Sequence, residues 1–127
     1  MKILSISGFA CYVQDLAKTS EFYERLGFRP GKQEAGRMTC YVNWFSVDFV
    51  EVSAEDKSEF AKEANLENKG AGLFINISVD TVDEFYEGII AKGFTPSSEP
   101  RDWPWGRREF VLRDPDGYKL VFFQKIK

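Results

Sequence analysis

The residue types that most often carry catalysis are unevenly represented in this chain. Histidine is absent from all 127 residues, which removes the commonest general base and the commonest ligand of transition metals. Cys11 lies on a predicted strand, but no histidine exists to activate its thiol as a nucleophile. The groups that remain for chemistry are carboxylates and aromatic rings. The sequence therefore favours ligand binding over catalysis, and no catalytic residue is predicted.

One set of candidate ligand contacts lies on a predicted hairpin in the first half of the chain. Alternation along its second strand places Phe49 and Glu51 on one side and Asp48 on the other. The side with Phe49 and Glu51 is expected to form a concave wall that offers a carboxylate to a cationic group. Ordinary sheet packing with an exposed Glu51 is the alternative. Tyr41 and Trp44, on the same hairpin, complete this set.

A second set lies in the other half, where Trp103 and Trp105 fall in a predicted loop. Because loops run over the surface, two indoles there are harder to explain as core residues. We expect at least one to contact a ligand, by stacking on a planar ring or by attracting a cation. The alternative is that one covers a sheet end or a subunit contact. Arg107 and Arg108, beside Glu109, are expected to form surface or interface ion pairs.

Composition restricts the class of protein. With 127 residues, 43% of them hydrophobic and 16% aromatic, the chain suits one domain with a proper core. The net charge of -3, with basic and acidic residues interleaved, argues against a nucleic-acid partner and suits a cationic ligand. No stretch has the length of a transmembrane helix or the pattern of a signal peptide, so we expect no membrane association. Cys11 and Cys40 are expected to be free, buried thiols in the cytoplasm.

An internal repeat divides the chain. The motif EFYE occupies 21–24 and again 84–87, an offset of 63, whereas Val13 and Val79 are offset by 66. The match therefore requires a gap on each side of EFYE. Two related half-domains are predicted from this repeat.

Each half is predicted to run strand, helix and three strands, the βαβββ order. The leading strands are predicted at 6–13 and 73–79, and glycines at 27 and 93 are expected to end the helices. The other strands are predicted at 29–34, 37–44, 47–53, 95–98, 108–113 and 119–125.

We expect one α+β domain over 1–127, with a first module at about 1–53, a connector at about 54–72 and a second module at about 73–127. Within the connector, 56–66 has the pattern of a short amphipathic helix. Each module is expected to hold a curled, mixed and incomplete sheet that leaves a concave face.

Three stretches resemble a known family. Residues 13–28 read V-x-D-L-x-K-x-x-x-F-Y-x-x-L-G-F, 104–110 read P-W-G-x-R-E-F, and 113–117 read R-D-P-D-G. Together with the paired βαβββ order, they resemble the vicinal oxygen chelate superfamily, which includes glyoxalase I, extradiol dioxygenases and bleomycin resistance proteins. The two stretches of the second half look particularly like the bleomycin resistance branch.

This resemblance implies where a metal would be held. In the metal-using branches the ligands stand on the leading strand of each half and on the last strand. The corresponding positions here are Gly8, Phe74 and Val121, and none of these coordinates a metal through its side chain. The resemblance therefore implies no metal and no cofactor. It also implies a homodimer in which modules complete a cup around the ligand.

The leading hypothesis is a metal-free binding protein that sequesters a small, partly aromatic and cationic compound, as bleomycin resistance proteins do. One alternative is a metal-independent isomerase or lyase that uses a carboxylate such as Glu51 as general base. Another is a non-catalytic module for ligand sensing or protein interaction that kept the fold and lost the chemistry.

Overall fold

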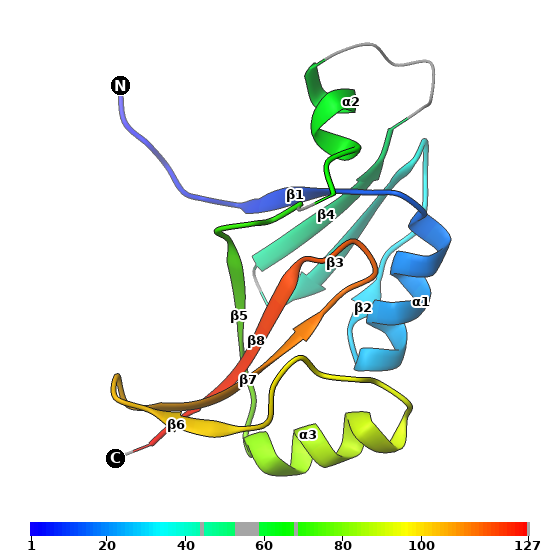
Figure 1. The fold of residues 1–127 in the computed structure, drawn as a ribbon. Coiled ribbons are helices and arrows are strands. Elements are labelled where there is room, and N and C mark those ends of the chain that lie inside the picture. The colour runs from blue at the N-terminus through cyan, green and yellow to red at the C-terminus, as the bar shows by residue number, and fades with distance from the viewer. Residues whose placement is uncertain (44, 53–58, 68, 127) are drawn as a thin grey trace. The chain divides into compact units, whose positions relative to one another are not determined.

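The chain forms two compact units, Met1–Glu67 and Asn68–Lys127. A computed structural model describes residues 1–43, 45–52, 59–67 and 69–126 (Figure 1). The first unit contains β1 (Gly8–Val13), α1 (Leu16–Leu26), β2 (Arg29–Pro30), β3 (Arg37–Val42), β4 (Phe45–Glu51) and α2 (Glu59–Ala64). The second unit contains β5 (Phe74–Ser78), α3 (Val82–Ala91), β6 (Arg101–Trp103), β7 (Arg107–Arg113) and β8 (Lys119–Lys125). The predicted α+β class and the βαβββ order of each half are confirmed.

The first unit has a four-stranded sheet in the order β1-β4-β3-β2, with β1 parallel to β4 and the other pairs antiparallel. One face of this mixed sheet packs against α1. Cys11, Phe49 and Met38 stand side by side there on three neighbouring strands, and all are buried. The Tyr23 ring of α1 lies 4.6 Å from the Phe49 ring. Aromatic and thiol side chains therefore form the core between sheet and helix.

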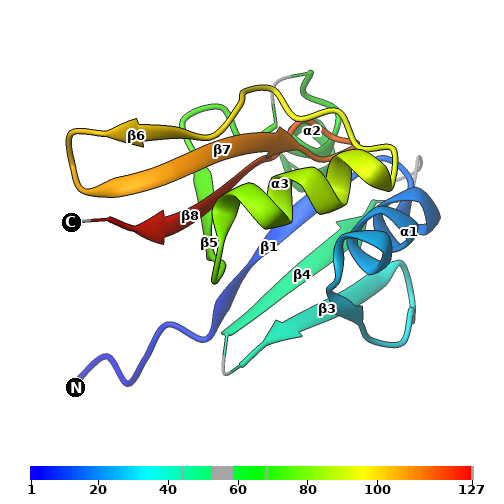
Figure 2. The ribbon, with the colours of Figure 1, turned by 90° about the horizontal axis from the view of Figure 1, so that it is seen from below.

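The second unit repeats this plan in the order β5-β8-β7-β6. Figure 2 shows α3 lying along the strands of this sheet, and its Phe85 ring lies 4.6 Å from Phe122 and 6.3 Å from Phe110. Leu120 and Leu112 lie on the same buried face. In both units, then, the helix packs on one face of the sheet.

The two helices are equivalent at an offset of 66 throughout. At the end of α1 the Phe28 amide donates to the Tyr23 carbonyl, and at the end of α3 the Phe94 amide donates to the Ile89 carbonyl. Tyr23 and Ile89 are both buried. The EFYE motif, at an offset of 63, is therefore not a structural repeat, and no gap is needed. The alignment of the two helices follows from which residues of each helix face the sheet. The EFYE motif faces different directions in the two helices.

One predicted strand is wrong. The segment 95–98 is irregular, and the edge strand of the second sheet is Arg101–Trp103 instead. Pro96 and Pro100 have no N–H, and two prolines within five residues disfavour a regular strand. Ser97 still donates to the Val111 carbonyl at 2.8 Å. The segment therefore follows β7 without forming a regular ladder.

The connector belongs partly to each unit. Its predicted amphipathic helix is present as α2, with Ala61 buried. In the second unit, Lys69 and Asp116 form a buried ion pair with an N–O distance of 3.2 Å. This ion pair connects the first residues of the second unit to the tight turn at 114–117. No helix in the described part of the chain is long and apolar enough to cross a membrane.

Candidate functional site

The face of the second sheet opposite α3 combines aromatic rings with cations. Strand pairing places Phe74 beside Lys119, and Trp103 beside Arg107, on this face. Arg101 and Phe123 belong to it through the two-residue alternation of β6 and β8. We call these six residues the aromatic-cationic face.

Each ring of this face has a cation above it. The Arg101 guanidinium carbon lies 3.8 Å from the centroid of Trp103, and that of Arg107 lies 3.9 Å from the centroid of Phe123. The Lys119 ammonium lies 4.4 Å from the centroid of Phe74. At these distances the ring quadrupole attracts the cation. The face is therefore ordered by three cation–π contacts.

The two predicted indoles are brought together at one end of this face. Trp103 ends β6, and Trp105 lies in the turn to β7, where the Gly106 amide donates to the Trp103 carbonyl at 3.1 Å. Gly106 has φ +82, a left-handed conformation that glycine adopts without strain. The indoles are stacked, with centroids 4.7 Å apart and planes at 11°.

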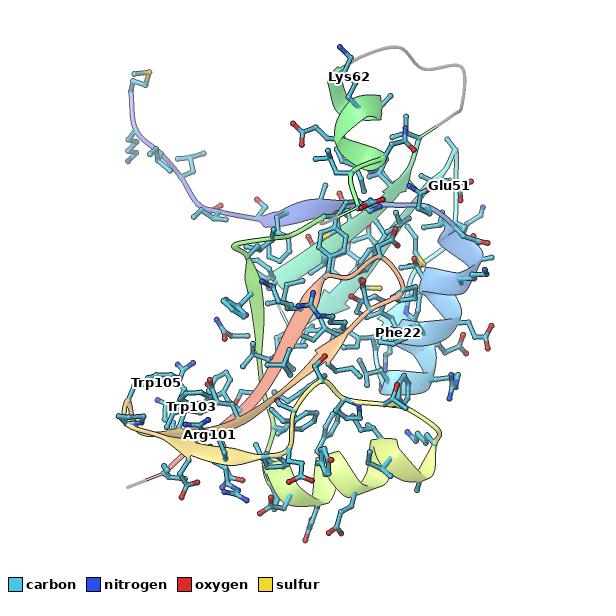
Figure 3. The ribbon with its side chains drawn as sticks, viewed as in Figure 1. Phe22, Glu51, Lys62, Arg101, Trp103 and Trp105 are labelled. Carbon is cyan, nitrogen blue, oxygen red and sulfur yellow. The ribbon has the colours of Figure 1, made fainter. Side chains whose placement is uncertain are left out.

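Arg101 extends this stack. The Trp103 ring contacts both the Arg101 guanidinium, at 3.8 Å, and the Trp105 ring, at 4.7 Å between centroids. Figure 3 shows the three side chains gathered in the order Trp105, Trp103, Arg101. Trp105 is 60% exposed, so part of its ring is open to solvent. A preformed stack with one open ring suits a planar ligand.

The predicted ion pairs of Arg107 and Arg108 are formed by Arg108. Arg108 projects to the α3 side, where it bonds Asp83 and Asp102, each at 3.0 Å. The hydrogen bond to Asp83, followed by that to Asp102, raises the pKa of Arg108 above its ordinary value. Arg107 points to the opposite face and lies over Phe123. Arg108 thus bonds to the helix, whereas Arg107 lines the aromatic-cationic face.

The structure separates the candidates of the first unit. Phe49 is only 1% exposed, because its side of β4 is the side that packs on α1. Glu51 also lies on that side, and its Oε2 accepts a hydrogen bond from the Leu16 amide at 2.8 Å. The expected concave wall of Phe49 and Glu51 is therefore occupied by the helix. Glu51 stabilises the first turn of α1 instead.

Sequence reasoning missed the counterpart of this contact. In the second unit, Gln124 Oε1 accepts from the amide of Val82, the first residue of α3, at 2.7 Å. The signal was available, because Leu16 and Val82 are related by the offset of 66. Glu51 and Gln124 therefore play the same structural part in the two modules.

Two other candidates lie on the face of the first sheet opposite α1. Tyr41 is exposed, and Asp48 accepts a hydrogen bond from the Thr39 hydroxyl at 2.7 Å. The guanidinium of Arg37 lies 3.8 Å from the same carboxylate. Trp44 lies outside the described residues.

The positions that correspond to metal ligands carry apolar groups. A Cβ at Gly8 would clash with the carbonyl of Ser46, so this position has no room for a side chain. Phe74 lies beneath Lys119, and Val121 is buried. Within 1–43, 45–52, 59–67 and 69–126, no group of three or more Cys, Asp or Glu side chains could hold a metal ion.

The cysteines are free and buried. Burial raises the pKa of Cys40 to about 11, so its thiol stays protonated at neutral pH. A protonated thiol is a poor nucleophile.

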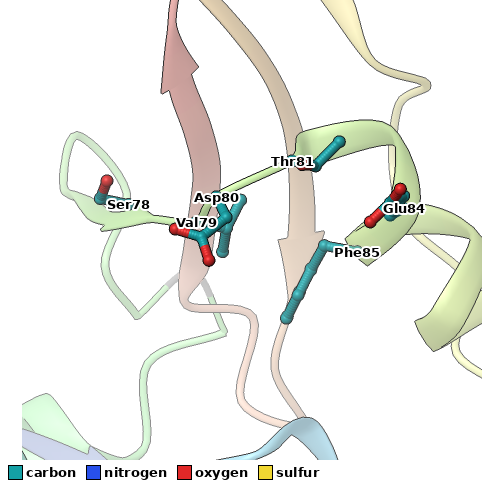
Figure 4. Close-up of a pocket in the computed structure, with 6 residues that line it drawn as sticks. All are labelled: Ser78, Val79, Asp80, Thr81, Glu84 and Phe85. Carbon is teal, nitrogen blue, oxygen red and sulfur yellow. The ribbon is translucent and has the colours of Figure 1, made fainter.

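An open depression of about 490 Å³ lies where β5 leads into α3. Figure 4 shows its lining residues along this connection and the first turn of the helix. Asp80 and Glu84 give it an acidic character, and Phe85 contributes a ring edge. None of the predicted site residues lines it.

Comparison with known proteins places the chain in a family. The model of the Glyoxalase/Bleomycin resistance protein/Dioxygenase superfamily matches residues 5–122. The chain belongs to this superfamily. Its similarity to other members extends to a bleomycin resistance protein of Geobacillus stearothermophilus, which is 31% identical over 123 residues, 91% of this chain and 92% of the relative.

Solved structures of the superfamily share the fold. A glyoxalase/bleomycin resistance protein/dioxygenase from Nocardioides matches with a TM-score of 0.83, at 19% identity, over 100% of this chain and 87% of its own. A bleomycin-binding protein complexed with bleomycin matches with a TM-score of 0.66, at 23% identity, over 96% of this chain and 99% of its own. The expected superfamily fold is confirmed by these likenesses.

Proposed function

We propose that this protein binds and sequesters a small, partly aromatic compound in the cytoplasm, without a metal and without making or breaking a bond. The observation that carries the proposal is the stack of Trp103 and Trp105, with its outer ring 60% exposed. A stacking platform formed before binding lowers the entropy lost when a planar ligand docks. The relative at 31% identity, named a bleomycin resistance protein, supports capture of an antibiotic of this kind.

The expected cationic group of the ligand has one candidate receptor in the predicted site. Asp48 lies on the face opposite α1, where its Oδ1 accepts from Thr39 and its Oδ2 lies 3.8 Å from Arg37 Nε, so a cationic group of the ligand would share this carboxylate with Arg37. Tyr41, exposed on the neighbouring strand, would offer a ring beside it. A homodimer is part of the proposal.

For the enzymatic alternative, the carboxylate of Glu51 is a less suitable general base than its residue type implies. Glu51 was the candidate, and its carboxylate is engaged by the Leu16 amide on the helix-covered side of the sheet. A carboxylate held in this way is poorly placed to take a proton from a substrate on the other face. A sensing or interaction module remains the second candidate, because it would use the same stack.

Calorimetric titration with bleomycin and a panel of polyaromatic antibiotics tests the proposal. We expect saturable binding, recovery of unaltered ligand by mass spectrometry, and no stoichiometric transition metal in elemental analysis. Trp105→Ala should weaken binding about tenfold, since one lost ring stack costs on the order of 1.4 kcal/mol. Ile90→Ala, an exposed apolar control on α3, should leave affinity unchanged. Turnover of any panel compound would contradict stoichiometric capture.

A further inference from the structure

The aromatic-cationic face has a charge opposite to that of the whole protein. The chain carries a net charge of -3. On the face of the second sheet opposite α3, the cationic side chains are Arg101, Arg107, Arg113, Lys119 and Lys125, and the one carboxylate among the described residues is Glu109. Such a concentration of one sign attracts a ligand of the other sign.

The guanidinium groups of this face keep donors available. The guanidinium carbons of Arg101 and Arg107 lie 3.8 Å and 3.9 Å from the centroids of their rings, and a guanidinium that stacks on a ring keeps its N–H groups pointing outward in its own plane. Stacking on a ring therefore leaves these donors uncovered. No carboxylate of the described residues forms a salt bridge with either side chain. Arg108, by contrast, has its donors engaged by Asp83 and Asp102.

We propose that this face selects a planar aromatic acid, whose ring stacks beside Trp103 and Trp105 while its carboxylate accepts hydrogen bonds from Arg101 and Arg107. This inference rests on the proposed function and specifies the class of ligand. Strand pairing sets Trp103 directly beside Arg107, so ring and acid group meet neighbouring side chains. Hydrogen bonds from arginine to a carboxylate are among the stronger polar contacts, and a planar fork matches a planar acid.

A cationic ligand would be repelled by the cations of this face. It would approach Arg101, Arg107 and Lys125, which pairs with Arg107, and each like charge would raise its energy. The rings of Trp103, Phe123 and Phe74 already have the protein's own cations over them, which leaves Trp105 as the open ring. The second sheet therefore favours an acid, whereas Asp48 on the first sheet is the receptor expected for a cationic group.

Three compounds with one ring system and different charges test this selectivity: 2-naphthoate, 2-naphthylmethanol and 2-naphthylmethylammonium. Calorimetric titration of the full chain should give the lowest Kd for the naphthoate. We expect a gap of about tenfold to the neutral alcohol, because one charge-assisted hydrogen bond contributes at least this much. Binding of the naphthoate should weaken as salt is raised, through screening of exposed charges.

Variants assign the effect to the arginines. Arg107→Gln should weaken naphthoate binding about tenfold and leave the alcohol unaffected, because a neutral ligand makes no ion pair. Arg107→Lys should have a Kd for the naphthoate between those of the wild type and Arg107→Gln, since lysine keeps the charge and lacks the planar fork of donors. Lys18→Gln on α1 removes the same charge elsewhere and should change neither Kd. Circular dichroism of each variant verifies the fold.

The outcomes separate the two proposals. Equal or tighter binding of the alcohol or the ammonium would overturn the selectivity for acids and leave capture of aromatic compounds standing. Tighter binding of a short thymidine oligonucleotide than of the naphthoate would also overturn it, in favour of a nucleic-acid surface. Failure of all three naphthalenes and of the antibiotic panel to bind would contradict both proposals.

Discussion

At the scale of single residues, Thr19 is the clearest defect in the packing. Its side chain is fully buried in α1, and its hydroxyl is a buried side-chain oxygen for which the described residues supply no hydrogen-bond partner. The offset of 66 makes Thr19 the counterpart of Phe85, which packs on the second sheet. A small polar side chain therefore occupies a position that its counterpart fills with a ring.

Thr19→Val should raise the free energy of unfolding by about 1 kcal/mol, because it removes an unpaired hydroxyl and keeps nearly the same shape. Helix propensity changes little between these two β-branched residues. Urea unfolding followed by circular dichroism measures the effect. Thr19→Ser keeps the hydroxyl and removes the methyl group, so it should lower stability. A lower stability for the valine variant would show that the hydroxyl has a partner.

At the scale of elements, the starts of α1 and α3 depend on side chains from the last strand of each module. Glu51→Ala should lower the free energy of unfolding by about 1 kcal/mol, because the Leu16 amide loses its acceptor. Gln124→Ala should cost a similar amount through Val82. Glu51→Gln copies the second module, keeps an acceptor and should retain most of the stability. Urea unfolding of the three variants measures these differences.

The Glu51 variants also test the enzymatic alternative. If Glu51 were a general base, Glu51→Gln would abolish turnover of any substrate while leaving the protein stable. If its function is to hold α1, the free energy of unfolding should be highest for the wild type, lower for Glu51→Gln and lowest for Glu51→Ala. Equal stability of all three proteins would contradict the structural role.

The elements that could be predicted are those with strong local signals. The strand 119–125 has the predicted bounds, and the helix stops at Gly27 and Gly93 follow from the left-handed conformation that glycine permits. The predicted offset of 63 between the helices is wrong. EFYE recurs as a sequence motif, but the structural equivalence of the helices is decided by which residues are buried against the sheet, and these are offset by 66. Alternation predicts which residues of β4 share a face, but it does not predict which of the two faces a helix covers.

The candidate site was predictable to a similar extent. Composition and position singled out Trp103 and Trp105, but their stacking depends on a turn around Gly106 that closes β6 onto β7. The basic charge of the second sheet does not show in the acidic total of the chain, because its cations are distributed over three strands and stand mainly at the strand ends. Strand pairing was needed to bring them onto one face.

At the scale of the whole molecule, the N-terminal residues carry apolar surface that the chain leaves uncovered. Ile3, Leu4 and Ile6 are 91%, 87% and 81% exposed, and they precede β1, an edge strand of the first sheet. Apolar side chains beside an unpaired strand edge favour association with another chain. This surface supports the homodimer that forms part of the proposed function.

Replacing Ile3, Leu4 and Ile6 together with serine should shift the protein from dimer to monomer. The reason is that three apolar side chains no longer leave water on association, at about 25 cal/mol per Å² of area. Sedimentation equilibrium measures the mass, and Lys2→Ser is the matched control, because it changes the same segment without removing apolar area. A monomeric wild-type protein, or a triple variant that remains dimeric, would mean that this segment does not hold two chains together. Ligand titration of the monomeric variant would then reveal whether one chain alone forms the binding site, because a site shared between subunits should lose affinity together with the dimer.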